Sequence, residues 1–385
     1  MTEPTSADHR EMLRDAVRSV LNRIDPIAEA RRQEARSPGY SVSSWTSFVT
    51  ELGAGGVLVP ERHGGLELGF ADVCAILEET GAVCYNGPFL SSSVLSVLML
   101  LRADTDVADD LTTIAAGGRT AAVTTLHHGV DPARWPEEVR ADASGTTWRL
   151  TGCASGVIHG FGADVVYVVA RHADGLGVWA VDADAPGHER RALTTLDLTR
   201  AQTEHTFDGA PARLVMSPKA DVSRFRAITT LATVALCAEQ VGGAQRVLAT
   251  TLDYARTRYQ FGRAIGSFQA IKHRCVDMAI AVEGAVASYS NARDQLDAAG
   301  GATAPDGPKL RQAAAIAGSF CSEAFLMVTG ASLQIHGGIG MAWEHDTHLY
   351  LRRAKASERL FGTPADQRAE LIATLDDREP QLSSA

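Results

Sequence analysis

The sequence predicts an α+β chain in which a small antiparallel β domain lies between an N-terminal helical domain and a C-terminal four-helix bundle. The first and last thirds have apolar residues at helical spacing, whereas the middle third consists of short segments rich in β-formers, separated by Gly, Asp and Pro. A length of 385 residues suits two or three domains. The expected parts are an N-terminal helical domain at 1–115, the β domain at 116–217, a C-terminal helical bundle at 218–376 and a frayed tail at 377–385.

Local hydrophobic patterns predict the individual helices and strands. Ser91–Leu101 is so apolar that it predicts a buried helix. Phe225–Arg258 has few breakers apart from Gly242 and Gly243, so it forms either one very long helix or two helices joined at the glycines. Further helices are expected at Arg10–Asn22, Trp45–Leu52, Ala71–Thr80, Ile271–Leu296 and Lys309–Gly330. Strands are expected at Ala121–Leu126, Trp148–Thr151, Val165–Ala170, Val178–Val181 and Thr203–Phe207.

Composition narrows the classes of function. Hydrophobic residues make up 45% of the chain and charged residues 21%, so a normal globular core is expected. The formal net charge of -10 argues against a nucleic-acid-binding protein, which needs a basic face to neutralise phosphates. An acidic chain can still carry a local basic site for a phosphorylated ligand.

Neither a secretory signal nor a membrane span is expected. The N-terminus is polar and has no apolar core, and apolar stretches such as Val94–Leu101 are too short to cross a bilayer. The cysteines are scattered without a CxxC pair, so reduced buried thiols in the cytoplasm are expected rather than disulfides or a metal site. They are Cys74, Cys84, Cys153, Cys237, Cys275 and Cys321.

The clearest local motif is YARTRYQFGRAIGSFQ, at Tyr254–Gln269. It is expected to end a long helix, turn at Gly262 and Gly266, and enter the next helix. Its arginines suit bidentate binding of phosphate. A basic helix end that complements the helix dipole has the same composition, so the residues alone leave both interpretations open.

A second motif, QIHGGIG, lies at Gln334–Gly340. Clustered glycines let a backbone approach a ligand closely, but glycine is also common where a helix ends. His336 within the motif is open to a structural or a catalytic interpretation.

The two motifs in this order, after a helical and a β domain, resemble the acyl-CoA dehydrogenase family. The resemblance covers nearly the whole chain. VPERHGGLELGFADVCAILEETG is similar to the family's first domain, WRLTGCASGVIHGFGADVVYVVA to its β domain, and LDLTRAQTEHTFDGAP to the strand pair that ends the β domain.

This resemblance implies FAD, bound across a subunit interface. In the family, the motif arginine and the following Gln-Phe contact the pyrophosphate and adenosine portion of the cofactor. The Gln-Gly-Gly segment of a neighbouring subunit covers the same cofactor, so an oligomer is implied. The matching residues are Arg258, Gln260 and Phe261 in the first motif and Gln334, Gly337 and Gly338 in the second, with Gln269 nearby.

Family chemistry removes two hydrogens across the Cα–Cβ bond of an acyl thioester of coenzyme A or a carrier protein. A carboxylate takes the α-proton while the β-hydrogen leaves as hydride to the flavin. The usual base directly precedes Gly-Thr near the C-terminus, and here that residue is Phe361. In some relatives the base lies on the first long helix of the bundle, at a position that falls near Ala232.

The middle domain also departs from the family. The usual Thr-Glu-Pro…Gly-Ser segment contacts the flavin ring and the thioester, and AAVTTLHHGVDPARW, with His127 and His128, replaces it. The dinucleotide half of the site is intact, whereas the flavin-ring half lacks its usual residues. Candidate replacement bases, each of which a structural role would also explain, are Glu239, Glu344, Asp346 and Glu358.

Three interpretations follow, and the sequence leaves them open. The chain is the base-lacking subunit of a two-gene, hetero-oligomeric dehydrogenase, or it is a self-sufficient homo-oligomer with a relocated base. The third interpretation is a flavoenzyme that needs no base, because its substrate loses CO2 or its flavin reacts with oxygen. The acyl group, its carrier, the electron acceptor and the pathway are not specified by the sequence.

Overall fold

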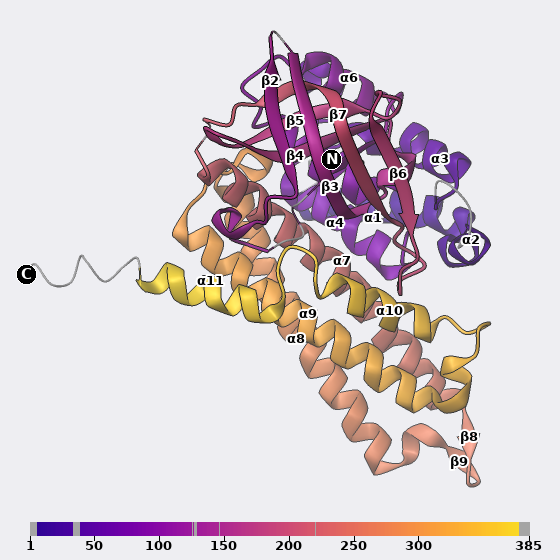
Figure 1. Ribbon diagram of the computed structural model, residues 1–385. Coiled ribbons are helices and arrows are strands. Elements are labelled where there is room, and N and C mark those ends of the chain that lie inside the picture. Colours follow the sequence, from indigo (N-terminus) through magenta and orange to yellow (C-terminus); the bar gives the residue numbers. More distant parts are fainter. Residues whose placement is uncertain are drawn as a thin grey trace, which may run out of the picture.

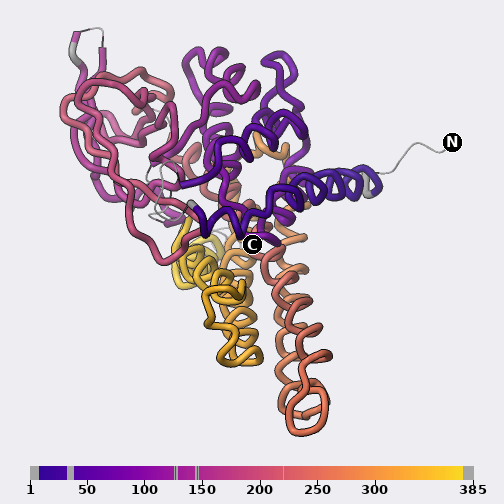
Figure 2. Tube along the Cα trace, turned by 90° about the vertical axis from the view of Figure 1, so that its right-hand side faces the viewer, coloured from indigo at the N-terminus to yellow at the C-terminus, as the bar shows by residue number. Residues whose placement is uncertain are grey.

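The computed structural model describes residues 6–33, 39–124, 126, 129–145, 147–219 and 221–376. It confirms the predicted fold class, with a helical N-terminal part, a β domain and a C-terminal helical part (Figure 1). The C-terminal helices extend away from the β domain as an elongated bundle (Figure 2). Helix gives way to strand after residue 115 and strand to helix after residue 216. The proposed domain boundaries stay a prediction, and the tail at 377–385 lies outside the described residues.

Local side-chain bonds shape the helices of the N-terminal part. The Ser41 hydroxyl accepts from the Ser44 amide (3.2 Å) at the start of α3. The helix expected at Ser91–Leu101 begins instead as a π-helix, in which the Ser96 hydroxyl donates to the Ser91 carbonyl (2.8 Å). Buried serines bond to the backbone and compete with regular α-helical bonds. The elements are α1 (Ser6–Ile24), α2 (Pro26–Gln33), α3 (Val42–Leu52), η1 (Ala54–Gly56), η2 (Glu61–His63), α4 (Phe70–Ala82), η3 (Phe89–Ser96), α5 (Val97–Leu100) and α6 (Ala108–Ala115).

The β domain is a sheet in the order β1-β4-β2-β3-β7-β5, and β4 also pairs with β5. Most pairs are antiparallel as expected, but β1 runs parallel to β4. β2 also runs parallel to β4. β3 runs antiparallel to β2, and β4 reverses the direction of the chain once more. The elements are β1 (Ala121–Val123), η5 (Pro132–Arg134), β2 (Val139–Ser144), β3 (Thr147–Ile158), η6 (Gly160–Gly162), β4 (Val165–His172), β5 (Gly175–Asp182), β6 (His188–Leu193) and β7 (Gln202–Met216).

The long C-terminal helix α7 is continuous through its glycines. A methyl group built at Gly242 would lie 1.9 Å from the carbonyl oxygen of Glu78 on α4, and one built at Gly81 would lie 2.0 Å from that of Glu239. The glycines therefore serve the close crossing of α4 and α7 rather than a break in the helix. The elements are α7 (Ser223–Thr257), β8 (Tyr259–Gln260), β9 (Arg263–Ala264), η7 (Ile265–Ser267), α8 (Gln269–Ala298), η8 (Gly301–Thr303), α9 (Pro308–His336), η9 (Gly337–Met341), α10 (Thr347–Ser357) and α11 (Pro364–Asp376).

Two expectations from composition need correction. The segments Ser223–Thr257 and Pro308–Met341 are long and apolar enough to cross a membrane, although the sequence indicated that the apolar stretches were too short. Their apolar windows are 94% and 61% buried inside the protein, as in the core helices of a bundle. The cysteines are buried as expected except Cys153, which is exposed on β3.

The α4–α7 crossing can be tested with one methyl group. Gly242→Ala should lower the free energy of unfolding by about 1–3 kcal/mol, because the backbone of α4 cannot move aside without cost. Gly330→Ala is the control, since a methyl group there, inside α9, meets nothing within 4 Å and alanine favours helix. Chemical denaturation followed by circular dichroism measures both. An unchanged stability of Gly242→Ala would contradict the close crossing.

Candidate active and cofactor-binding site

The two sequence motifs meet at the far end of the C-terminal bundle. Tyr254, near the end of α7, stacks on His336 at the end of α9, with ring centroids 4.3 Å apart. One turn earlier, a buried hydroxyl–hydroxyl bond joins the same two helices. These contacts place Arg258, which follows α7, and Gly337, which follows α9, at the same end of the molecule (Figure 1).

The β8–β9 hairpin projects from this end. Phe261 at its tip has a φ of 54° and is 88% exposed. The Arg263 guanidinium lies 3.9 Å from the centre of the Phe268 ring, and this cation–π contact supports the hairpin. Ile339 and Met341, which follow α9, are also exposed. Several exposed apolar side chains at one end are typical of a surface that another molecule covers.

All the residues that the resemblance assigns to the cofactor are exposed at this end. They are Arg258, Gln260, Phe261, Gln269, Gln334, Gly337 and Gly338. A methyl group at either glycine would meet nothing within 4 Å, although Gly337, with a φ of 64°, ends α9 in a conformation that favours glycine. A guanidinium, carboxamides and an open glycine backbone suit a diphosphate group that docks from outside. The residues present therefore fit the adenosine diphosphate end of FAD.

The two positions of the family's base lie in the apolar interior. Phe361 is 2% exposed and Ala232 is fully buried, and both belong to one apolar cluster. The Gln367 side chain donates to the Phe361 carbonyl (2.9 Å) and lies against Gly318 beside the Thr233 methyl. The two positions therefore face the same interior, and neither carries an acid.

The segment that replaces the family's Thr-Glu-Pro…Gly-Ser motif packs into the same region. The Trp135 ring meets Phe225 of α7 edge-on, with centroids 5.9 Å apart. The Thr229 hydroxyl donates to the Val130 carbonyl at 3.4 Å. A methyl group at Gly362, next to Phe361, would lie 3.2 Å from a methyl carbon of Val130. His127 and His128 lie outside the described residues.

Among the candidate bases, Glu239 is buried between two arginines that sequence reasoning missed. Its Oε1 accepts hydrogen bonds from both Arg200 and Arg353. Arg353 also donates to Asp197 (2.8 Å) and to the Thr199 carbonyl (2.6 Å). Burial works against the charge of Arg353, but Asp197 and Glu239 outweigh it and raise the pKa of Arg353 above its usual value. Asp197, Thr199 and Arg200 fall together in the segment that is similar to the family's strand pair, but Glu239 and Arg353 lie far from them in the sequence, so no motif signalled the network as a whole.

Two of the other candidate carboxylates are already ion-paired, and Glu358 among them is three residues before Phe361. Asp346 pairs with Arg31 (2.9 Å), and Glu358 pairs with Lys355 (3.0 Å) at the surface. Glu344 and Asp346 line an open cleft beside the end of α9. The structure thus does not bring the four candidates together into one site.

Comparisons with known proteins place these features in context. Residues 7–106 match the model of the acyl-CoA dehydrogenase N-terminal domain, and residues 227–375 match that of the C-terminal domain. The chain is 31% identical to acyl-CoA dehydrogenase IpdE2 of Mycobacterium tuberculosis, over 94% of this chain and 96% of the relative.

Two solved structures extend the comparison. One is the ChsE4–ChsE5 complex of Mycobacterium tuberculosis, with a TM-score of 0.85 and 26% identity, covering 98% of this chain and 99% of that chain. The other is a variant of the Tcur3481–Tcur3483 steroid ACAD, with a TM-score of 0.84 and 27% identity, covering 97% and 99%.

The network around Glu239 gives a prediction about stability. Glu239→Gln should lower the free energy of unfolding by about 3–5 kcal/mol, because two buried guanidinium groups lose their shared carboxylate. Glu358→Gln removes a surface partner of Lys355 and should cost at most about 1 kcal/mol. Thermal and urea unfolding of the two variants measure the difference. Equal stability of both variants would contradict the structural role of Glu239.

Proposed function

This chain belongs to the acyl-CoA dehydrogenase family of FAD-dependent oxidoreductases, and from that premise we propose that it is the base-lacking subunit of a hetero-oligomeric dehydrogenase. The complex would introduce an α,β double bond into an acyl thioester. In it, this chain supplies the adenosine diphosphate half of a flavin site, and a second family member supplies the flavin-ring half and the base.

The observation that carries this proposal is the closed interior at both base positions. Phe361 and Ala232 share one buried apolar cluster, and Trp135 and Phe225 belong to it as well. An α-proton next to a thioester is only weakly acidic, so its removal needs a positioned base. Neither of the two positions carries a carboxyl group, which favours a base that comes from another chain.

The exposed motifs support the cofactor half of the proposal. Arg258 would pair with the diphosphate through charge-assisted hydrogen bonds, and Gln260 and Gln334 offer amide donors beside it. Gly337 and Gly338 leave the backbone free to approach the same group. When bound, FAD accepts the hydride that leaves the β-carbon of the thioester. These residues hold and orient the cofactor but take no proton.

The surroundings of the candidate bases give less support to a relocated base. Glu239 is shared by two buried arginines, so its charge is already neutralised within the network. Asp346 and Glu358 each pair with a basic side chain. Glu344 lines a cleft that neither Phe361 nor Ala232 lines.

The similar structures support a partner and a substrate class. Both are named for pairs of chains, ChsE4 with ChsE5 and Tcur3481 with Tcur3483, and the second is described as a steroid ACAD. We therefore expect a hetero-oligomer that acts on a thioester with a steroid-derived acyl group. A coenzyme A carrier fits the acyl-CoA dehydrogenase names of the relatives.

Anaerobic reduction of the flavin by steroid-derived and straight-chain acyl-CoA thioesters tests the proposal. The chain purified alone should react at least about 10²-fold more slowly than the chain co-expressed with a base-carrying family member encoded beside it, because a positioned base contributes about 10²–10⁴-fold. Fast reduction by the lone chain would reject the proposal, and single substitutions of the four candidate carboxylates would then locate its base. Turnover of a β-keto acid or of oxygen alone would favour the base-free interpretation.

A further inference from the structure

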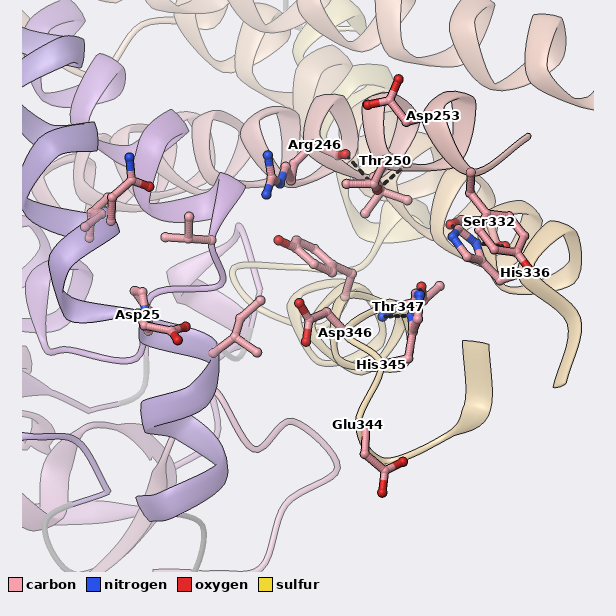
Figure 3. A pocket seen from close by; sticks show the side chains of 18 of the residues that line it. Asp25, Arg246, Thr250, Asp253, Ser332, His336, Glu344, His345, Asp346 and Thr347 are labelled. Carbon is pink, nitrogen blue, oxygen red and sulfur yellow. Dashed lines mark hydrogen bonds between the residues drawn. The ribbon is translucent and has the colours of Figure 1, made fainter. Parts of the chain in front are cut away.

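An open cleft of ≈ 580 Å³ lies between the N-terminal and C-terminal helices, and neither Phe361 nor Ala232 lines it. Its walls come from the α1–α2 junction, the last turns of α7, the end of α9 and the segment that leads into α10 (Figure 3). No function has been assigned above to this cleft, and the size is that of a binding pocket rather than a packing defect.

One wall of the cleft is aromatic. The Tyr254 ring stacks on His336, and His336 meets the His345 ring at a centroid distance of 4.9 Å. The His336 Nδ1 bonds to the Ser332 carbonyl (2.8 Å). Burial lowers the pKa of His336, so this ring is neutral near pH 7. His336 is buried against Tyr254 and His345, so the half-buried Tyr254 ring is the part of this wall that can meet a cation.

The charged residues of the lining are mostly acidic. The lining has a single arginine, Arg246, and four carboxylates, Asp25, Asp253, Glu344 and Asp346. Figure 3 shows Asp253 and Glu344 at opposite ends of the cleft, with Arg246 and Asp346 between them. Asp346 and Asp253 each have an arginine partner outside the lining. Over the residues that the structure describes, no basic group lies within ion-pair distance of Asp25 or Glu344.

The cleft directly adjoins the proposed cofactor half-site. Thr257 and His336 line it, and the next residue after each is Arg258 and Gly337 respectively. A second chain that brings its flavin ring to these motifs therefore comes within reach of the cleft. This step rests on the proposed function, because it takes the flavin-carrying chain to be a different family member.

We propose that the cleft receives an arginine side chain of the flavin-carrying partner subunit. A planar guanidinium can stack on the Tyr254 ring while its N–H groups bond to carboxylates, a combination that a lysine ammonium does not offer. The acidic cleft lies next to the basic end of α7, with Arg256 and Arg258. Adjacent patches of opposite charge fix the orientation of a complementary partner.

A small-molecule probe tests the cleft without any partner. N-acetyl-arginine amide should bind the full-length chain at least about tenfold more tightly than N-acetyl-citrulline amide, its neutral isostere, because only the former carries a charge. The double variant Asp25→Asn/Glu344→Gln should lose that preference. Asparagine suits position 25, where φ is 49°. Titration followed by NMR measures the affinities, and equal binding of the two amides overturns the proposal even if the heteromeric function holds.

The purified hetero-oligomer provides the second measurement. Asp25→Asn/Glu344→Gln should weaken association with the partner by roughly ten- to a hundredfold and reduce its dependence on salt. The matched control, Asp142→Asn/Asp184→Asn, removes two exposed carboxylates of the β domain and should leave the affinity unchanged. Equal affinities of the two double variants overturn the proposal. A lone chain that self-associates through the cleft, with the same variant abolishing the dimer, overturns it as well, in favour of a second copy as the occupant.

Discussion

The buried charge network of Arg200, Glu239, Arg353 and Asp197 is the interaction on which the arrangement of the three layers depends. All four side chains are nearly inaccessible to water, and the charges of the two arginines and two carboxylates balance. Arg353 alone donates to Asp197 and Thr199 of the β domain, to Glu239 of α7 and to the Tyr85 carbonyl after α4. A buried network of this kind is costly to disrupt in part, since any group that loses its partner remains buried.

The same network fixes the segment that would otherwise hold the catalytic base. Arg353 lies in α10, and the Ser357 hydroxyl at the end of that helix accepts a hydrogen bond from Arg200 (3.2 Å). The chain then turns through Phe361, whose backbone has a φ of 58° and whose carbonyl is bonded to Gln367. An anchored helix and a turn in the left-handed region leave the segment little freedom to open. Phe361 thus follows directly on a helix that the network anchors.

Most of the fold could be predicted from the hydrophobic periodicity of the sequence and from the order of its motifs. Helix α8 shows buried residues at helical spacing over many turns, and the unbroken apolar run Val165–Ala170 marks a buried strand. β6 escaped because its side chains are mostly polar and charged, as at a sheet edge. β2 lies between β3 and β4, but it is short and polar residues separate its few apolar ones. The continuity of α7 could not be predicted either, because what Gly242 contacts depends on α4, which is far away in the sequence.

Only those parts of the site that lie within one short stretch of sequence could be predicted. Arg258 and Gln334 lie in compact motifs, whereas the partners of Glu239 come from positions 200 and 353, which no single short segment connects. Sequence alone therefore cannot distinguish a catalytic carboxylate from a structural one that pairs with an arginine far away in the chain. The cleft beside α9 is likewise assembled from segments that no single motif covers.

The most direct measurement of the central claim is the flavin content of the hetero-oligomer with one arginine removed from this chain. Arg258→Ala should release FAD from a complex whose ring-binding residues and base lie in the partner, since the diphosphate loses a charge-assisted bond worth about 1.5–3 kcal/mol. Arg256→Ala, two residues away and paired with Asp253 at the surface, should retain it. Flavin absorbance after gel filtration gives both contents. Full retention by the Arg258→Ala complex would contradict the claim that this chain holds half of a shared flavin site.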